Sequence, residues 1–188
     1  MYAFTLLLVR VALSGQTSRY LERVASLQLA LMLCVYSLSM APALLDLDLA
    51  GHAGPHAGLL VFLVLVTQLS DVSQYLFGKL LGRHTIVPAV SPNKTWEGFI
   101  GGMGCATVLG VALHGLTPFG APAAGLIALG VALAGFGGGL VMSAIKRDRG
   151  VKDFGSLIPG HGGVLDRVDS LVIAAPLFFH ITRYYFGA

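Results

Sequence analysis

The sequence is poor in charge. Only 11% of its 188 residues are Asp, Glu, Lys or Arg, whereas 55% are hydrophobic, and the formal net charge is +3. Soluble domains carry roughly 25% charged residues, so this chain has too few of them to cover a water-facing surface. That shortage excludes an ordinary soluble globular protein and predicts a membrane protein. The 25 glycines agree, because small residues let helices approach closely in lipid.

Other residue types and motifs are also scarce or missing. The two cysteines, Cys34 and Cys105, lie in apolar runs without CxxC spacing, which predicts small core residues and no redox function. The patterns GxxxxGK[ST], HExxH and GxSxG are absent, so nucleotide binding of the familiar soluble kinds is not supported. The first residues lack a basic region, so we expect no cleaved signal peptide.

Six apolar segments are predicted to be helices, and all but the first reach about 17–25 residues, the length that a bilayer requires. They are 1–14, 24–45, 57–77, 98–116, 121–143 and 169–187. No repeat or low-complexity linker divides them, so we expect a single membrane domain over residues 1–188. The predicted fold class is an all-α integral membrane protein, a polytopic helical bundle of about five to six membrane helices.

Charge alternates between the connections that join these segments. Three connections contain Lys and Arg, and two contain none. The basic ones are 15–23, 78–97 and 144–168, and the others are 46–56 and 117–120. The positive-inside rule therefore predicts that the three basic connections lie in the cytoplasm.

The segment from Ser143 to Asp169 holds nine of the chain's 21 charged residues in 27 positions. Lys and Arg suit phosphate oxygens and Asp suits metal ions, so the mixture predicts the handling of anionic phosphates. Asp166 and Asp169 stand at i, i+3, and a helix beginning near Leu165 puts both carboxylates on one face. A divalent cation between them would relieve their repulsion. The alternative is that both residues only cap a helix.

The same segment contains further candidates for binding phosphate. Its turn 159–163, PGHGG, offers backbone N–H groups near a helix N-terminus. Lys146 and Arg147 follow an apolar helix and are either membrane-interface anchors or phosphate ligands. Asp153 either completes a metal shell or holds Lys152 in place. No role is expected for two of their neighbours, Asp148 and Arg149.

A second polar group lies at the end of the third apolar segment. Ser70 and Asp71 follow an apolar run, and an ionisable side chain at the membrane boundary is a functional candidate. The stretch 91–98, SPNKTWEG, is predicted to be the entry to the next helix, with Lys94 free to reach a phosphate. Its helix cap is expected from one of two neighbours, Asn93 or Thr95.

Two other patterns receive structural interpretations. Glycines at small-xxx-small spacing are predicted to pack helices and are assigned no chemistry. These pairs are Gly98 with Gly102 and Gly135 with Gly139. An acidic and His-containing connection is interpreted as a solvated outer loop, because no second element supplies metal ligands. Its residues are Asp46, Asp48, His52 and His56.

These polar residues resemble the signature of the phosphatidate cytidylyltransferase (CDP-diacylglycerol synthase) family. The long motif reads Ser143-x2-Lys146-Arg147-x4-Lys152-Asp153-x-Gly155-x2-Ile158-Pro159, followed by Gly160-His161-Gly162-Gly163-x2-Asp166-Arg167-x-Asp169. The upstream Ser70-Asp71 and 91–98 stretches resemble that family's other characteristic stretches. The resemblance covers about residues 60–187. Gln74 is a departure, because the family more often has Ala at this position.

The resemblance implies transfer of a cytidylyl group from CTP to phosphatidate, giving CDP-diacylglycerol and pyrophosphate for phospholipid biosynthesis. It implies a bacterial plasma-membrane enzyme whose site faces the cytoplasm, with 57–188 as its catalytic region and 1–56 as N-terminal helices that look truncated. Mg²⁺, with a second cation, is the implied cofactor. The implied partners are CTP, a lipid phosphate, membrane lipids and a second copy in a homodimer, with no nucleic acid.

The resemblance also assigns roles to individual residues. The implied metal ligands are Asp166, Asp169 and Asp71. The implied catalytic residues are Lys146, Arg147, Lys152, Asp153 and His161. The implied substrate-binding residues are Ser70, Ser91, Asn93, Lys94, Thr95, Ser143, Gly162, Gly163 and Arg167.

Three alternatives stay open at this point. Gln74 favours the same reaction on a different lipid phosphate. The short N-terminal region favours a non-catalytic or truncated family member. A cation transporter would use Asp71, Asp166 and Asp169 to line an ion path, but such a path would not place Lys146 and its basic neighbours at its mouth.

Overall fold

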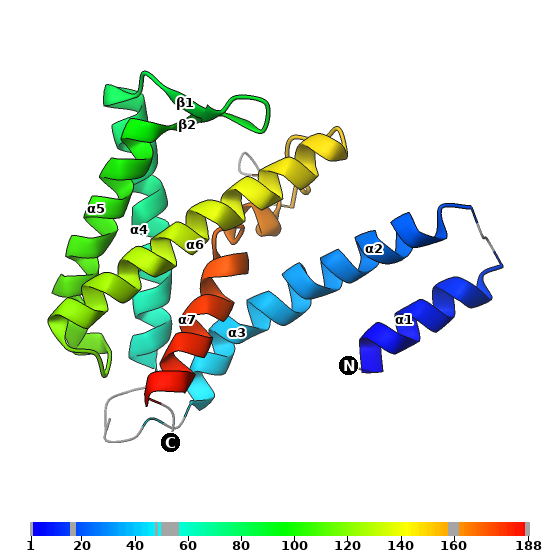
Figure 1. Ribbon diagram of the computed structural model, residues 1–188, viewed down its shortest axis with the longest axis horizontal. Coiled ribbons are helices and arrows are strands. Elements are labelled where there is room, and N and C mark those ends of the chain that lie inside the picture. Colours follow the sequence, from blue (N-terminus) through cyan, green and yellow to red (C-terminus); the bar gives the residue numbers. More distant parts are fainter. Residues whose placement is uncertain (1, 16–17, 48, 50–56, 158–161, 187–188) are drawn as a thin grey trace.

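Residues 2–15, 18–47, 49, 57–157 and 162–186 are described by the computed structural model, which is mostly helical (Figure 1). Its elements are α1 (Tyr2–Leu13), α2 (Tyr20–Ala30), the π-helix η1 (Leu31–Ser37), α3 (Leu38–Ala43), the 3-10 helix η2 (Leu44–Asp46), α4 (Ala57–Leu81), β1 (Thr85–Val87), β2 (Ser91–Thr95), α5 (Trp96–Ala112), the 3-10 helix η3 (His114–Leu116), α6 (Ala121–Asp148), the 3-10 helix η4 (Val164–Arg167) and α7 (Leu171–Phe186). Each predicted apolar segment contains a helix, so the predicted helical membrane bundle is confirmed.

Three helical stretches within the described ranges are long and apolar enough to cross a membrane. They are Tyr20–Asp46, which joins α2, η1, α3 and η2, then α4 and α6, with 27, 25 and 28 residues. At roughly 1.5 Å per residue, each exceeds the roughly 30 Å of bilayer hydrocarbon. The helices α1, α5 and α7 are apolar but shorter. The chain is therefore an integral membrane protein.

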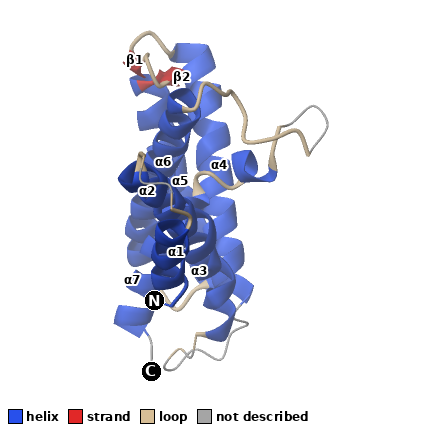
Figure 2. Ribbon diagram, turned by 90° about the vertical axis from the view of Figure 1, so that its right-hand side faces the viewer, coloured by secondary structure: helices blue, strands red, loops and turns tan. Residues whose placement is uncertain are grey.

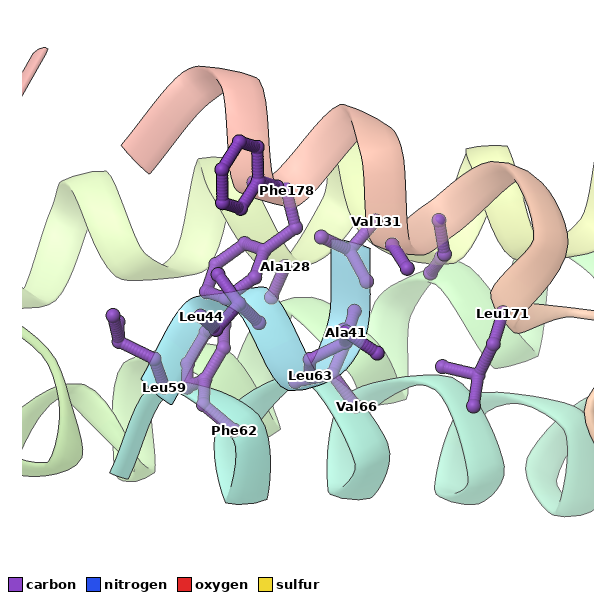
Figure 3. Packing of buried hydrophobic residues seen from close by; sticks show 14 of the residues in the cluster. Ala41, Leu44, Leu59, Phe62, Leu63, Val66, Ala128, Val131, Leu171 and Phe178 are labelled. Carbon is purple, nitrogen blue, oxygen red and sulfur yellow. The ribbon is translucent and has the colours of Figure 1, made fainter. Parts of the chain in front are cut away.

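The core lies where α4, α6 and α7 meet the C-terminal part of the Tyr20–Asp46 stretch (Figure 3). Phe62 of α4 stacks on Phe178 of α7 with 5.5 Å between ring centroids. Leu44 packs into the same fully buried cluster. Cys34 and Cys105 are exposed, so the prediction that they belong to the core is wrong. In a membrane the outward face of a helix is also apolar, and hydropathy therefore does not separate it from the core.

Glycines let α4 and α5 lie close together. Gly98 and Gly102 of α5 are buried, and a Cβ at Gly98 would lie 2.5 Å from the backbone oxygen of Gln74. A Cβ at Gly102 would lie 3.1 Å from the backbone oxygen of Ser70. The predicted packing role of this glycine pair is confirmed.

A short antiparallel hairpin joins α4 to α5 and was not predicted. Strands β1 and β2 pair Thr85 with Thr95 and Val87 with Ser91. Thr95 then caps α5, because its hydroxyl oxygen accepts a hydrogen bond from the N–H of Gly98 at 3.2 Å. The predicted helix entry is therefore confirmed, but the residues before the cap form a strand.

Two of the three basic connections lie toward one end of the bundle. Figure 1 shows the hairpin and the C-terminal end of α6 toward the same end, with η3 at the opposite end. The side view in Figure 2 shows the hairpin at one end of helices that run in a common direction. The predicted clustering of the polar connections is confirmed, and the side of the membrane on which they lie stays a prediction.

The last helix begins later than expected. Val164–Arg167 form a 3-10 helix and α7 starts only at Leu171. Asp166 and Asp169 therefore do not share one face of a continuous α-helix, and that prediction is wrong. The physical reason lies in the contacts of Asp166 described below, which hold this turn apart from α7.

Candidate active site

A cavity of about 250 Å³ opens at the hairpin end of the bundle. Five separate elements line it: α4, β2, α5, α6 and the turn before α7. Its polar lining residues include Asp71, Gln74, Asn93, Lys94, Ser143 and Asp169. The two polar groups recognised in the sequence therefore meet in one site.

The polar face of α4 supplies the first wall. Asp71 and Gln74 are three residues apart, so both lie on the same side of the helix. The amide nitrogen of Gln74 lies 3.5 Å from Asp71 Oδ1, at the long limit for a hydrogen bond. Ser70 is buried, and its hydroxyl donates to the backbone oxygen of Thr67 at 2.9 Å, so it faces the helix and not the cavity.

The hairpin brings Lys94 into the bundle. Its ammonium group donates to the backbone oxygen of Phe136 at 3.3 Å and lies 4.4 Å from the centre of the Phe136 ring. Gly139 makes room for it, because a Cβ there would lie 2.9 Å from Lys94 Nζ. Burial lowers the pKa of Lys94, and the negative charges of Asp71 and Asp169 oppose that shift. Lys94 thus shares the cavity with two carboxylates whose negative charge favours its protonated form.

The base of the hairpin is fastened to α5 by Glu97. One carboxylate oxygen accepts from the N–H groups of Arg83 and His84 at 3.1 and 3.3 Å. The other lies 2.6 Å from Nδ1 of His84. These contacts fix the start of the hairpin, and through it the strand that carries Lys94.

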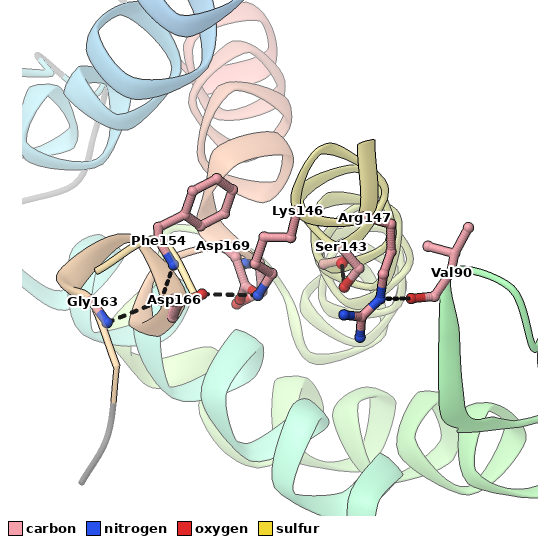
Figure 4. A network of polar contacts seen from close by, with 10 residues as sticks. Val90, Ser143, Lys146, Arg147, Phe154, Gly163, Asp166 and Asp169 are labelled. Atoms are coloured by element: carbon pink, nitrogen blue, oxygen red, sulfur yellow. Dashed lines mark hydrogen bonds and ion pairs between the residues drawn. The ribbon is translucent and has the colours of Figure 1, made fainter. Parts of the chain in front are cut away.

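The end of α6 supplies a buried ion pair (Figure 4). Lys146 Nζ lies 2.8 Å from Asp166 Oδ1, and the two side chains are only 14% and 5% exposed. Asp166 Oδ2 accepts from the N–H groups of Phe154 and Gly163 at 2.8 and 3.0 Å. Burial alone would raise the pKa of Asp166, but these donors outweigh it and lower the pKa. Both oxygens of Asp166 are therefore already bonded.

Asp169 is in a different environment. Its Oδ1 accepts from the N–H of Ser170 at 2.9 Å, and the side chain lines the cavity. Burial raises the pKa of Asp169, and the nearby cations Lys146 and Lys94 only partly offset that. A carboxylate whose ionised form is disfavoured by burial gains most from an added cation.

The donor set of the cavity fits Mg²⁺. This ion is commonly held by one or two carboxylates, with waters and substrate phosphates completing its shell. Asp71 and Asp169 both line the cavity and meet that requirement. Within the described ranges no cluster of three or more His, Cys, Asp or Glu side chains forms a fully protein-ligated site. The residues thus match an ion whose shell a phosphate substrate completes.

The other predicted site residues fall into three groups. Ser91, Asn93, Thr95 and Ser143 line the cavity with Lys94. Arg147, Lys152, Asp153 and Arg167 are exposed and are not among the lining residues, and Arg147 Nε donates to the backbone oxygen of Val90 at 3.4 Å. Gly163 holds Asp166, and Gly162 has a positive φ of 80° that favours glycine. His161 lies outside the described residues, as do Asp48, His52 and His56 of the predicted outer loop.

Several lining residues were not predicted from the sequence. Gln74, Tyr75, Phe99, Phe136 and Gly139 all line the cavity. The position of Gln74, one turn after Asp71, is a signal that would have found it. For Phe136 and Gly139, which lie within an apolar helix, the sequence carries no such signal.

Comparison with known proteins agrees with this site. The chain matches the cytidylyltransferase family over residues 1–185. It is 44% identical over 185 residues to the uncharacterized protein YnbB of Escherichia coli (strain K12), covering 96% of this chain and 61% of that protein. It is 43% identical over 120 residues to the phosphatidate cytidylyltransferase of Staphylococcus aureus (strain COL), covering 63% of this chain and 46% of that enzyme. The phosphatidate cytidylyltransferase of Staphylococcus saprophyticus is 42% identical over the same length and coverage.

The chain thus spans about half to three fifths of the length of these relatives. The matched region nevertheless includes every element that lines the cavity. The chain belongs to the cytidylyltransferase family.

Proposed function

We propose that the protein transfers a cytidylyl group from CTP to phosphatidate, giving CDP-diacylglycerol and pyrophosphate. The observation that carries this proposal is the cavity in which Asp71, Lys94 and Asp169 meet at the hairpin end of the membrane bundle. Relatives named phosphatidate cytidylyltransferase support the choice of acceptor. At about 250 Å³ the cavity is small for a ligand site, so it suits the reacting phosphates and not the whole of both substrates.

The reaction joins two anions. An oxygen of the lipid phosphate attacks the α-phosphorus of CTP, the bond from that phosphorus to the oxygen bridging to the β-phosphate breaks, and pyrophosphate leaves. Because a phosphate oxygen is the nucleophile, no side chain has to form a covalent intermediate. Mg²⁺ bound by Asp71 and Asp169 would neutralise the charge of the phosphates.

The chain's own residues orient the substrates. Lys94 is held over Phe136 in the cavity that the two carboxylates also line, where its ammonium group is able to bind a phosphate oxygen. Asn93 lines the same cavity and supplies further donors, whereas the hydroxyl of Ser143 already donates to the backbone oxygen of Gly139 at 2.6 Å. Asp166 keeps Lys146 at the edge of the site, so we propose a positioning role for it in place of metal binding.

Exposed basic side chains at this end of the protein attract the anionic substrates. Arg147 and Lys152 lie on the same end of the protein, and a basic entrance attracts anionic nucleotides. The proposed roles of His161 and Asp153 in catalysis rest on the motif alone. We further propose that this end faces the cytoplasm of a bacterial plasma membrane, because the basic residues of the hairpin connection and of the end of α6 lie there.

A different lipid phosphate is the second candidate acceptor. Gln74 lines the cavity and its amide lies beside Asp71, so it adds a polar group where the acceptor phosphate is bound. The relative that matches nearly the whole chain, YnbB, does not carry the name of a phosphatidate enzyme.

One assay tests both candidates. The purified chain in detergent is incubated with radiolabelled CTP, Mg²⁺ and phosphatidate, lysophosphatidate or a polyprenyl phosphate. Labelled CDP-diacylglycerol from phosphatidate is the expected product, and a preference for another acceptor would replace phosphatidate by that lipid. Asp71→Asn should be inactive, whereas Asp46→Asn, at an exposed position of η2 that does not line the cavity, should behave as wild type. A folded sample that labels no acceptor would refute the enzymatic proposal.

A further inference from the structure

A groove of about 620 Å³ runs between the Tyr20–Asp46 stretch and α6. It lies outside the catalytic cavity. Its walls are almost entirely apolar: Leu29 and Leu33 on one side, Met142 and Ile145 on the other, with Phe154 and Leu165 at one end. The α6 residues that face it lie on a different face of the helix from Gly139 and Ser143, which line the catalytic cavity.

A basic pocket of about 590 Å³ continues this groove. Arg19 and Arg23 of the first long stretch line it together with Arg149, which follows α6. Ser26 and Arg149 belong to both the groove and the pocket. Arg149 donates to the hydroxyl of Ser26 at 2.8 Å and so joins the two walls where they meet. The two hollows form one continuous feature with an apolar part and a cationic part.

The neighbouring carboxylates do not neutralise the positive charge of the pocket. Glu22 lies 3.8 Å from Arg19, and Asp148 lies 3.6 Å from Arg149. All four side chains are at least 61% exposed, and ion pairs of this kind contribute little. Three guanidinium groups thus face two carboxylates, and the pocket keeps an excess of positive charge.

The basic pocket and the apolar groove are arranged like the headgroup and the acyl chains of a lipid in the membrane. Figure 1 shows the start of α2 and the end of α6 on the same side of the bundle as the hairpin. The apolar groove extends from there along two membrane-spanning stretches. In a bilayer the arginines lie at the level of the headgroups and the groove borders the acyl chains. Basic pockets between membrane helices at this level bind anionic headgroups.

We propose that this feature binds an anionic phospholipid, with its phosphate on Arg19, Arg23 and Arg149 and one acyl chain along the groove. Guanidinium groups bind phosphate oxygens through paired hydrogen bonds. The positive charge of the pocket favours a headgroup with net negative charge over a zwitterionic one, whose cation the arginines repel. The site is separate from the catalytic cavity and does not depend on the proposed reaction.

Phe154 connects the lipid site to the catalytic residues. Its side chain lines the groove, its N–H holds Asp166 at 2.8 Å, and its ring lies 5.4 Å from Lys146 Nζ. A chain in the groove packs against this ring and so restrains the Lys146–Asp166 pair. Lipid binding should therefore raise the thermal stability of the catalytic end.

The test measures binding directly and needs no turnover. The full chain in detergent is titrated with phosphatidylglycerol, phosphatidylcholine or inorganic phosphate, and the bound lipid is counted by native mass spectrometry beside a thermal unfolding curve. Phosphatidylglycerol should bind about tenfold more tightly than phosphatidylcholine, because the choline cation of phosphatidylcholine is repelled by the arginines of the pocket. Inorganic phosphate alone should give little stabilisation, because it leaves the groove empty.

Matched variants locate the site. Arg149→Gln should weaken phosphatidylglycerol binding about tenfold, whereas Arg10→Gln on α1 should not change it. Leu29→Trp fills the groove and should reduce the binding of both lipids, whereas Leu21→Trp, at a 78% exposed position of the same helix, should not.

Three results would overturn the proposal. One is wild-type lipid binding by both Arg149→Gln and Leu29→Trp. Another is equal stabilisation by inorganic phosphate and by lipid. The third is a change in oligomeric state of Leu29→Trp on gel filtration with no lipid retained by wild type, which would assign the groove to a second copy of the chain. None of these results bears on whether the chain transfers a cytidylyl group.

Discussion

Lys146 and Asp166 form a buried ion pair at 2.8 Å that ties the end of α6 to the turn before α7. Asp166 adds two hydrogen bonds from backbone N–H groups, so one carboxylate organises three segments of chain. The neighbouring acidic residue of the same motif, Asp169, lines the cavity instead. Asp166 and Asp169, three residues apart, thus have different roles: Asp166 holds the turn, and Asp169 lines the cavity. Variants at the two positions should have different effects on stability and activity.

Asp166→Asn should destabilise the protein as well as inactivate it. The change leaves the ammonium group of Lys146 buried without its anionic partner, and breaking a buried pair costs about 3–5 kcal/mol. The amide keeps an acceptor for the N–H of Phe154, which favours the lower end of that range. A fall in apparent melting temperature in detergent, together with lost activity, is expected. Unchanged stability would show that the pair does not hold the turn.

Asp169→Asn and Asp71→Asn should abolish activity without that loss of stability. Burial already disfavours the ionised form of Asp169, so removal of its charge should leave the melting temperature equal or higher. If both residues hold the metal ion, turnover should fall by more than about 100-fold. Binding of Mn²⁺, followed by its electron paramagnetic resonance signal, should weaken in both variants. Wild-type Mn²⁺ binding in either would remove that residue from the metal site.

Much of this architecture was predictable because lipid imposes strict demands on the chain. Every backbone polar group in a membrane has to be bonded internally, so long apolar runs become helices and polar residues gather in the connections. The six helices and the cap at Thr95 follow from these rules. The sequence predicted that Asp71, Lys94 and Asp169 lie at the same end of the bundle. It did not predict that they line one cavity.

The rest depends on contacts that a linear pattern does not contain. The expected helix from Leu165 is replaced by a 3-10 helix because Asp166 is bonded to Phe154, twelve residues earlier in the chain. The strand Ser91–Thr95 contains Pro92 and polar residues of low strand propensity, so its pairing with β1 carried no sequence signal. The lipid groove was also missed, because Arg149 gains its role only from Ser26, 123 positions away.

Acid should weaken the protein through Asp166. The pKa of this group is lower in the folded chain than its ordinary value of 3.8, so its ionised form stabilises the fold. That contribution is present above the ordinary value and is lost as the pH falls from there through the folded pKa. The difference in melting temperature between wild type and Asp166→Asn should therefore be largest near neutral pH and shrink below about pH 4.

The control for this pH series is Asp46→Asn, an exposed position at the end of η2. Its melting temperature should follow that of wild type at every pH. A gap between wild type and Asp166→Asn that does not shrink as the pH falls below the ordinary pKa of 3.8 would contradict the assigned ion pair, since below that value the unfolded chain binds the proton more readily than the folded one.

Gly139→Ala should displace Lys94 without unfolding the protein. The new methyl group would lie 2.9 Å from Lys94 Nζ, and the end of a flexible lysine is able to move away. Lys94 would then lose its contacts with Phe136, and the KM for CTP should rise about tenfold or more, as loss of a charged hydrogen bond implies. Lys94→Met should show the same rise, because it removes the ammonium group outright.

Gly137→Ala, two residues away on the same helix, is the matched control. A Cβ at Gly137 would meet no atom within 4 Å, so the KM for CTP should equal that of wild type. Replacing glycine by alanine inside a helix should also stabilise the protein by up to about 1 kcal/mol. If Gly139→Ala keeps the wild-type KM while Lys94→Met raises it, Lys94 acts from a position other than the one over Phe136. If neither variant changes KM, Lys94 does not bind the nucleotide.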